Sequence, residues 1–458
     1  MELTEEEYIN MWKAFYGAPT QTQSFNNNNN NRSFPKSCFN EDGKLYSSMS
    51  SILENKVFDD FLENKSTCKY LISIIPFFYT TERDELFKFL SEKERIKNYS
   101  QDTIGNHFVQ ALIKTCNDDE LLIIRDALMD DIVGLSKNRD ACRVVQKLFT
   151  QAPSHITIPL IQKYRNYCFD LSMSQNGNHV MSVVIKVFDF EDIEFIFKEF
   201  NSNKKKLIDA SKDQFGCRVI QLSLKILVSY ISSSQKHQVE GRKQNVLSTI
   251  TCTCKILLEH SKELIRHEFA NYVIQQLIIS HELSSFLKVI IKDALKGNLY
   301  NLSREKFASH VIETALEHSR GECLKMLFDD LFEELSIDES EKSQKLSTLL
   351  THQFGNYVIQ RALIVSLDVK LEKQKGDGSW YKRLSSKIIF QSNDVKQCAT
   401  LKRILEIIEK QQKIESHNKM VSENPLLQKL FDINCNTTTG KINTNNTHEK
   451  LSNSQTLI

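Results

Sequence analysis

The chain is 458 residues long and carries 59 Lys and Arg against 58 Asp and Glu, a formal net charge of +1 at pH 7. This balance excludes a polybasic protein that holds nucleic acid by bulk charge, so any such recognition must come from local chemistry. Eleven cysteines are scattered without a Cys-x-x-Cys pair, which favours a reducing compartment over a disulfide framework.

The N-terminal segment is polar. Residues 21–40 include a run of six asparagines, a composition that cannot bury enough apolar surface to offset the entropy lost on ordering. We therefore expect residues 1–44 to form a mostly disordered arm. The start, MELTEEEYIN, is acidic and lacks an apolar run, so no secretory leader is expected, and no stretch is apolar enough to span a membrane.

The rest of the chain has helical periodicity. Segments such as ELLIIRDALMDDIVGL and LKRILEIIEKQQKI, with only six prolines and thirteen glycines in the whole sequence, predict an all-α fold. We expect one long domain over residues 45–415, because a repeat array grows without enlarging a single core. Residues 416–458 are again polar and predict a flexible tail.

One short pattern returns along this domain. Its copies read IGNHFVQAL, ACRVVQKL, GNHVMSVV, FGCRVIQLSL, FANYVIQQL, FASHVIETAL and FGNYVIQRAL, and a worn copy, TCKYLISII, precedes them. We call the first polar residue of each copy its anchor. From the first full copy onward the anchors follow at intervals of 36, 36, 39, 54, 38 and 47 residues. The anchors are Cys68, Asn106, Cys142, Asn178, Cys217, Asn271, Ser309 and Asn356.

Each copy separates an apolar side from a polar triplet. In NYVIQQL, Val273, Ile274 and Leu277 should pack against neighbouring helices, whereas the anchor and the residue four positions on lie one above the other on another face. The residue between them lies beside both, so stacked repeats would line up one triplet per unit. The triplets are Asn106, His107, Gln110; Cys142, Arg143, Gln146; Asn178, His179, Ser182; Cys217, Arg218, Gln221; Asn271, Tyr272, Gln275; Ser309, His310, Glu313; and Asn356, Tyr357, Gln360.

The triplets match the pairing edges of nucleobases. Two amides, as in Asn271 with Gln275, satisfy the acceptor, donor and acceptor of uracil. One Gln amide beside a small residue, as in Cys142 with Gln146, suits adenine, and only Glu313 offers the two acceptor oxygens that guanine requires. The middle residues offer flat surfaces for stacking bases. Asn106 with Gln110 and Asn356 with Gln360 share the uracil pattern, and Cys217 with Gln221 shares the adenine pattern.

These units resemble Pumilio (PUF) repeats, each of which reads one RNA base. The resemblance covers residues 45–415 with a capping segment at each end. It implies a right-handed α-solenoid crescent of eight three-helix repeats, with single-stranded RNA antiparallel along the concave side. It further implies a monomeric cytoplasmic regulator of messenger RNA 3′-untranslated regions, with no enzymatic activity and no cofactor, which recruits a deadenylase complex. Read from the last repeat, the triplets predict a 5′-UGUANAU element.

Two repeats depart from the family pattern. Ser182 is too short to replace a glutamine amide, so the base at this place should be poorly discriminated. In the first repeat Cys68 and Lys69 predict weaker RNA contacts, because Ile72 stands where a polar reader is needed and cannot hydrogen-bond a base edge.

Two long intervals contain polar insertions. Residues 229–244, SYISSSQKHQVEGRKQ, predict a surface loop, and the acidic residues 328–345 predict either a docking element for a protein partner or a solvated spacer. In the family, the loop between the last two repeats often contacts proteins.

Two other functions, and two candidate metal sites, have some support in the sequence. A helical scaffold of armadillo type that binds only proteins agrees with the neutral net charge, and a nucleolar Pumilio-like ribosome-biogenesis factor would share the repeat but tends to be basic with eroded triplets. A metalloenzyme is disfavoured, because His267 and Glu268 lack the second histidine of HExxH. Cys252 and Cys254, near His260, lack a second ligand pair.

Overall fold

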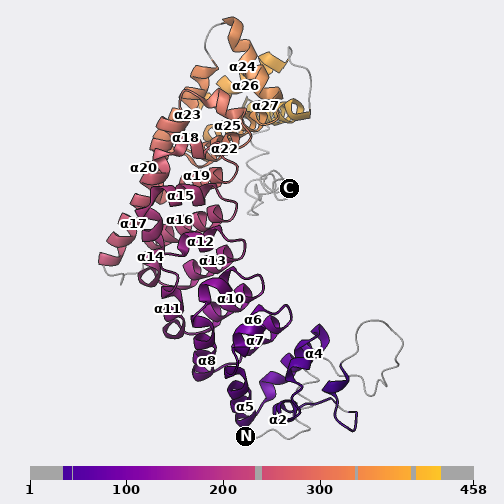
Figure 1. Ribbon diagram of the computed structural model, residues 1–458. Coiled ribbons are helices and arrows are strands. Elements are labelled where there is room, and N and C mark those ends of the chain that lie inside the picture. Colours follow the sequence, from indigo (N-terminus) through magenta and orange to yellow (C-terminus); the bar gives the residue numbers. More distant parts are fainter. Residues whose placement is uncertain (1–34, 44, 233–239, 336–338, 393–398, 424–458) are drawn as a thin grey trace. The chain divides into compact units, whose positions relative to one another are not determined.

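The described part of the chain is helical. The computed structural model describes residues 35–43, 45–232, 240–335, 339–392 and 399–423 (Figure 1). Within these ranges the isolated bridge between Phe39 and Leu45 is the one β-type pairing, so the predicted all-α class is confirmed. The chain divides into two compact units, Met1–Ile196 and Phe197–Ile458.

In the first unit a short helix, an anchor-bearing helix and a longer third helix follow one another in a repeating order. The anchor-bearing helices, called anchor helices below, pack in series: α7 contacts α4 and α10, and α10 contacts α13. The anchor helices are α4 (Lys65–Ile74), α7 (Gly105–Ile113), α10 (Ala141–Gln151) and α13 (Gly177–Val187). The other elements are η1 (Lys36–Cys38), α2 (Met49–Glu54), α3 (Phe58–Leu62), η2 (Ile75–Phe77), α5 (Thr80–Ser91), α6 (Arg95–Gln101), α8 (Asp118–Met129), α9 (Ile132–Lys137), α11 (Ser154–Gln162), α12 (Cys168–Met173) and α14 (Phe190–Ser202), whose last turns belong to the second unit.

The second unit repeats this order. Its anchor helices also pack in series, α16 on α19, α19 on α22 and α22 on α25. They are α16 (Gly216–Ser232), α19 (Ala270–Ile279), α22 (Ala308–His318) and α25 (Gly355–Lys370). The other elements are α15 (Lys204–Lys212), α17 (Glu240–Glu259), α18 (Ser261–Leu264), η3 (His281–Leu283), α20 (Ser284–Ile290), η4 (Ile291–Leu295), α21 (Leu299–Ser303), α23 (Gly321–Glu334), α24 (Glu339–Thr351), α26 (Ser379–Ser392) and α27 (Ala399–Glu423).

The apolar side of each anchor helix forms the core of its unit. Val273, Ile274 and Leu277 of α19 are fully buried, as the periodicity predicted. Burying each such side chain contributes about 1.5–3 kcal/mol, and each helix buries its apolar side mainly against its neighbours. Stability within a unit is therefore a sum over successive helix contacts.

A polar side chain four residues before the anchor organises the start of most anchor helices. Asp102 Oδ1 accepts hydrogen bonds from the backbone N–H groups of Ile104 and Gly105, at 2.8 and 2.6 Å. The first amides of a helix have no partner within the helix, so this acceptor satisfies them. Asn138, Ser174, Asp213, His267 and His352 act in the same way in their own repeats.

The residue before the anchor must be small. A Cβ atom on Gly177 would lie 2.5 Å from the carbonyl oxygen of Leu171, and one on Gly105 would lie 2.9 Å from that of Tyr99. Glycine therefore lets α13 and α7 begin directly against the backbone of the helix before them.

The predicted surface loop at residues 229–244 is wrong for residues 229–232 and 240–244, which are helical. Helix α16 continues to Ser232 and α17 begins at Glu240, so only residues 233–239 of the insertion lie outside the described residues. The lengthened helices account for most of the extra chain, because apolar residues such as Leu227 continue the core stripe of α16 and are fully buried.

The acidic insertion is also largely helical, in α23 and α24. Its residues 336–338 lie outside the described part of the chain. Asp330 is buried, and both its carboxylate oxygens accept from the N–H of Gly297, at 2.9 and 3.0 Å. Glu334 accepts from the N–H of Leu299 at 2.9 Å. These two carboxylates therefore cap the turn before α21 and its first residue.

The domain limits differ from the expected ones. Cys38 is fully buried in η1, inside the expected arm, and α27 runs to Glu423, beyond residue 415. Residues 1–34 of the expected arm and 424–458 of the expected tail lie outside the described residues. No single described helix is long and apolar enough to cross a membrane, although α15 and α16, bent by 111°, pass that test as a pair.

Candidate nucleic-acid interface

The three residues of each triplet lie at different depths. Tyr272 and Tyr357 are 50% and 48% exposed, whereas the anchor Asn271 is 1% exposed. The other anchors are buried too, whereas the middle residues are exposed. The anchors form a floor, and the flat middle side chains stand around it. The exposed middle residues are Lys69, His107, Arg143, His179, Arg218, Tyr272, His310 and Tyr357.

The three Asn–Gln pairs share one internal hydrogen bond. Gln275 Nε2 donates to Asn271 Oδ1 at 2.8 Å. The pairs Asn106 with Gln110 and Asn356 with Gln360 repeat it at 2.9 Å. The same contact in three copies indicates a preformed amide pair.

Backbone carbonyls set the direction of this bond in α19. Asn271 Nδ2 donates to the carbonyl oxygens of His267 and Glu268, both at 2.8 Å. Its two amide hydrogens are thereby used, so Oδ1 must face Gln275 and Gln275 must present Nε2. The pair then offers a base the remaining lone pairs of the two amide oxygens and the second N–H of Gln275.

The Cys–Gln pairs are arranged differently. Gln146 Nε2 and Gln221 Nε2 donate to the backbone carbonyl oxygens of Cys142 and Cys217, at 3.0 and 3.1 Å. Burial raises the pKa of both thiols, so they stay neutral at pH 7. Each glutamine keeps its carbonyl oxygen and one N–H, which match the amino group and ring nitrogen of adenine.

Glu313 is the one buried carboxylate among the triplets. It is 8% exposed, and the Nδ1 atom of the His310 imidazole lies 3.5 Å from Glu313 Oε1. Among the described residues, no side chain or backbone group lies closer than His310 as a hydrogen-bond donor to the Glu313 carboxylate. Ser309 is turned away, since its hydroxyl donates to the carbonyl oxygen of Lys306 at 3.2 Å. Two acceptor oxygens are thus held at the floor without a strong donor.

The two departing repeats lack an amide reader. Ser182 donates to the carbonyl oxygen of Asn178 at 2.7 Å and is occupied by its own helix. In α4, Ile72 has no polar group, and the buried Cys68 thiol, whose pKa burial raises to about 11, donates to the carbonyl oxygen of Ile104 at 3.7 Å.

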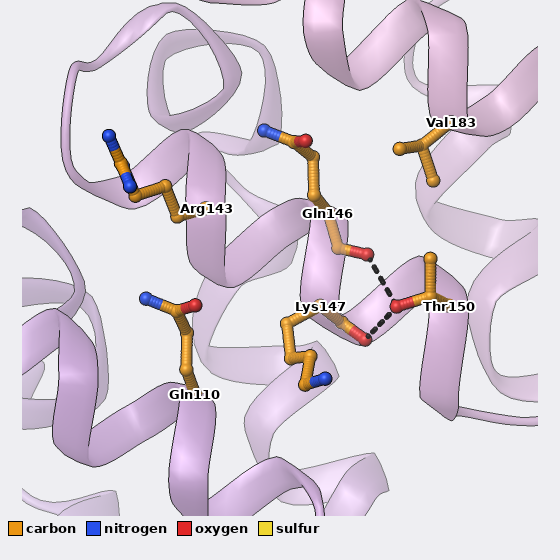
Figure 2. A pocket seen from close by; sticks show the side chains of 6 residues that line it. All are labelled: Gln110, Arg143, Gln146, Lys147, Thr150 and Val183. Carbon is orange, nitrogen blue, oxygen red and sulfur yellow. Dashed lines mark hydrogen bonds between the residues drawn. The ribbon is translucent and has the colours of Figure 1, made fainter.

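The first unit has an open hollow on this face, of about 330 Å³ (Figure 2). Gln110 comes from α7, whereas Arg143, Gln146 and Lys147 come from α10. Within the described part of the chain, no acidic group pairs with Lys147 or Arg143. The hollow therefore combines two free cations with two amides. Thr150 and Val183 complete its lining.

Sequence reasoning missed two kinds of residue. The capping side chains four residues before the anchors were visible as a repeated polar position in the aligned copies. The cross-helix contact of Thr314, whose Oγ1 lies 3.0 Å from Gln275 Oε1, joins residues 39 apart and has no local signal. His267 is accounted for by its cap, and the described residues contain no group of three or more His, Cys, Asp or Glu that could hold a metal.

Comparisons with known proteins agree with this geometry. The profile of the Pumilio-family RNA binding repeat matches residues 95–129, 131–163, 167–200, 207–225, 260–279, 298–332 and 346–368. These segments contain every anchor from Asn106 onward, whereas the worn copy at Cys68 lies outside them.

Relatives and solved structures extend the likeness. The chain is 27% identical to Fem-3 mRNA-binding factor 1 and 26% identical to Fem-3 mRNA-binding factor 2, both of Caenorhabditis elegans, over 84% of its own length. It spans 66% and 64% of those proteins. The fold is similar to that of PUF-6 in complex with 5BE13 RNA, with a TM-score of 0.69, 23% identity and coverage of 79% of this chain and 100% of that one. The fold is also similar to that of the Puf3 RNA binding domain bound to a Cox17 RNA 3′ UTR recognition sequence. The TM-score is 0.60 and the identity 20%, over 79% of this chain and 96% of that one.

Proposed function

The chain belongs to the Pumilio family of RNA-binding repeat proteins, and from that premise we propose that it binds single-stranded RNA sequence-specifically through its triplets. The observation that carries the proposal is the matched floor: preformed amide pairs, glutamines beside thiols, and one buried carboxylate, each on its own anchor helix. Exposed flat side chains beside each anchor from Asn106 onward supply stacking surfaces. A surface selected only for solubility would require neither the buried polar floor nor these stacking side chains.

We propose 5′-UGUANAU as the element. The Asn356, Asn271 and Asn106 pairs read uracil, Glu313 reads guanine, and the Cys217 and Cys142 pairs read adenine. The unspecified base faces Ser182, whose hydroxyl is engaged by its own helix. Because the anchors are buried, the readers that remain half-exposed, Gln110, Gln146, Gln221 and Gln275, make the larger share of base contact.

The biological role follows from the relatives. Two relatives carry names of mRNA-binding factors, and one of the matching structures holds a 3′ UTR recognition sequence. We propose that this chain acts in the same way, as a monomeric cytoplasmic regulator that binds 3′-untranslated regions and recruits co-regulators such as a deadenylase complex. No catalytic step is assigned to it.

The test is a fluorescence-anisotropy titration of the full chain at physiological salt. A labelled UGUAAAU RNA is compared with UAUAAAU and with a scrambled sequence of equal composition. Loss of the guanine should weaken binding at least tenfold, since a wrong base at a bidentate reader costs about 1–3 kcal/mol. Equal affinity for the scrambled RNA would refute sequence-specific reading and leave the protein-binding scaffold as the better explanation.

A further inference from the structure

The residue directly after each reader, five positions after the anchor, faces the preceding repeat. In α22 this residue is Thr314. Its hydroxyl oxygen lies 3.0 Å from Oε1 of Gln275 on α19, the anchor helix before it. A side chain of one repeat thus contacts the reader of another.

The same arrangement occurs in the first unit. Lys147, five positions after its anchor on α10, lines the hollow together with Gln110 of α7. Val183, in the same position on α13, lines it together with Gln146 of α10 (Figure 2). The geometry therefore recurs on α10, α13 and α22, whereas Arg361, in the same position on α25, pairs with Glu317 at 3.3 Å.

In α19 this contact completes a chain of hydrogen bonds with a fixed direction. Asn271 directs Oδ1 at Gln275, and Gln275 turns Nε2 toward it, which leaves Gln275 Oε1 facing Thr314. Two oxygens 3.0 Å apart need a proton between them, so Thr314 must donate it. The Thr314 hydroxyl also lies 2.9 Å from the carbonyl oxygen of His310, which therefore does not receive this proton.

We propose that the side chain five positions after the anchor on α10, α13 and α22 is a further specificity-determining residue, which acts on the base read by the preceding repeat. The inference rests on the proposed RNA-reading function. Thr314 is a positioning residue: it holds Gln275 Oε1, so that the free N–H of Gln275 points to the base. Uracil accepts this N–H through a carbonyl oxygen, whereas cytosine places its own amino donor on the same edge.

The other two repeats differ in a way that fits their bases. Lysine can only donate, so the unpaired ammonium of Lys147 favours the same orientation of Gln110 and selects bases with carbonyl oxygens. Val183 makes no hydrogen bond and leaves Gln146 free to match the amino group and ring nitrogen of adenine. The position is polar beside these two uracil readers and apolar beside this adenine reader.

The test compares Thr314→Val, which removes the hydroxyl but keeps the shape, with the conservative Thr314→Ser. Dissociation constants are measured for UGUAAAU and for UGCAAAU, which differ at the third base. We expect the preference for uracil over cytosine to fall about 3- to 10-fold in Thr314→Val, the effect of one neutral hydrogen bond, and to be retained in Thr314→Ser. Discrimination at the guanine should not change.

Thr351→Val is the matched control, because the Thr351 hydroxyl donates only to carbonyl oxygens of its own helix, those of Ser347 and Thr348. It should keep the full uracil preference. Lys147→Met is an independent second variant, which should lower the uracil preference at the seventh base alone.

The outcomes separate the two proposals. If the wild type prefers uracil and Thr314→Val keeps the same uracil-to-cytosine ratio, the cross-repeat role is wrong and the reading function stands. If the wild type itself shows no base preference, both fail. A thermal melt of each variant verifies folding, and should Thr314→Val unfold, an unchanged ratio in Lys147→Met overturns the inference.

Discussion

Helix α22 lies between α19 and α25 and contacts both, yet its reader is held in another way. The two flanking helices carry amide readers bonded to their own anchors at 2.8 and 2.9 Å, and both begin at a histidine cap. Helix α22 carries a buried carboxylate, Glu313, and the imidazole of His310 lies 3.5 Å from it. An amide reader that meets a wrong base can return to its internal bond, whereas Glu313 has no such alternative. We therefore expect guanine to be read more strictly than uracil.

The largest expected effect comes from converting α22 into a helix of the flanking type. Ser309→Asn with Glu313→Gln should recreate the amide pair and change the preferred second base from guanine to uracil. Each base contact is about 1–3 kcal/mol, so the guanine-to-uracil ratio should shift about 100-fold. Competitive anisotropy titrations with UGUAAAU and UUUAAAU measure it. A double variant that still demands guanine would contradict the assigned code.

The single change Glu313→Gln separates binding from stability. It should weaken binding of UGUAAAU about tenfold, because one acceptor oxygen becomes a donor. It should also raise the free energy of unfolding by about 1 kcal/mol, because a buried charge without a strong partner disfavours the folded state. Denaturant unfolding and anisotropy give the two values. The same change at the exposed Glu406 of α27 should alter neither by as much.

Lowering the pH should act on α25 and spare α22. The cap of α25 requires neutral His352, whose Nδ1 accepts from the N–H groups of Phe354 and Gly355. Burial, and then the charge of Arg304, lower the pKa of His352, so this stabilisation is complete above about pH 6.5 and is lost as the pH falls through the lower folded-state pKa. Hydrogen exchange should show the first turn of α25 opening below that pH while α22 keeps its protection.

The variant His352→Asn is the control for this effect. Asn138 makes the same two bonds in α10, both at 2.9 Å, and does not titrate. The variant should keep the cap and remove the pH dependence. Unchanged pH dependence in the variant would exclude the histidine cap as its cause.

The smallest expected effect concerns the buried acid Asp330, which, unlike Glu313, does have backbone partners. Burial raises the pKa of Asp330 to about 6, above that of the unfolded chain. The folded state therefore binds more protons between about pH 4 and 6, and stability falls as the pH rises through this window. Asp330→Asn, which keeps one acceptor for Gly297, should raise stability at pH 7.5 by roughly 1 kcal/mol or less and flatten that slope. A loss of stability on this substitution would show that the charge itself stabilises the turn.

The sequence predicted well what is local and periodic. The all-α class, the buried face of α19 and the recurrence of the anchors all followed from helical spacing. The depth of the anchors did not, because exposure depends on how closely the neighbouring helices pack, as at Gly177 and Leu171. The contact between Thr314 and Gln275 joins residues on different helices, and no single copy of the pattern shows it.

The two long insertions were misjudged for another reason. Polar composition predicted a surface loop at residues 229–244, but α16 and α17 extend into it, and α23 extends into the acidic segment because apolar residues such as Leu331 continue its buried stripe. Composition averages over a segment, whereas burial acts on single residues. Asp330 and Glu334 contribute to the acidic composition of this segment, although their carboxylates accept hydrogen bonds from backbone N–H groups.

The close approach of glycine to a neighbouring carbonyl oxygen, as at Gly177 and Gly105, also bears on how such a protein changes its target. In α7 and α13 the direction of the anchor helix is fixed by main chain meeting main chain, one residue before the triplet begins. Substitutions within the triplet leave that alignment untouched, so new base preferences can arise, by natural drift or by engineering, one repeat at a time without realigning the scaffold that presents them.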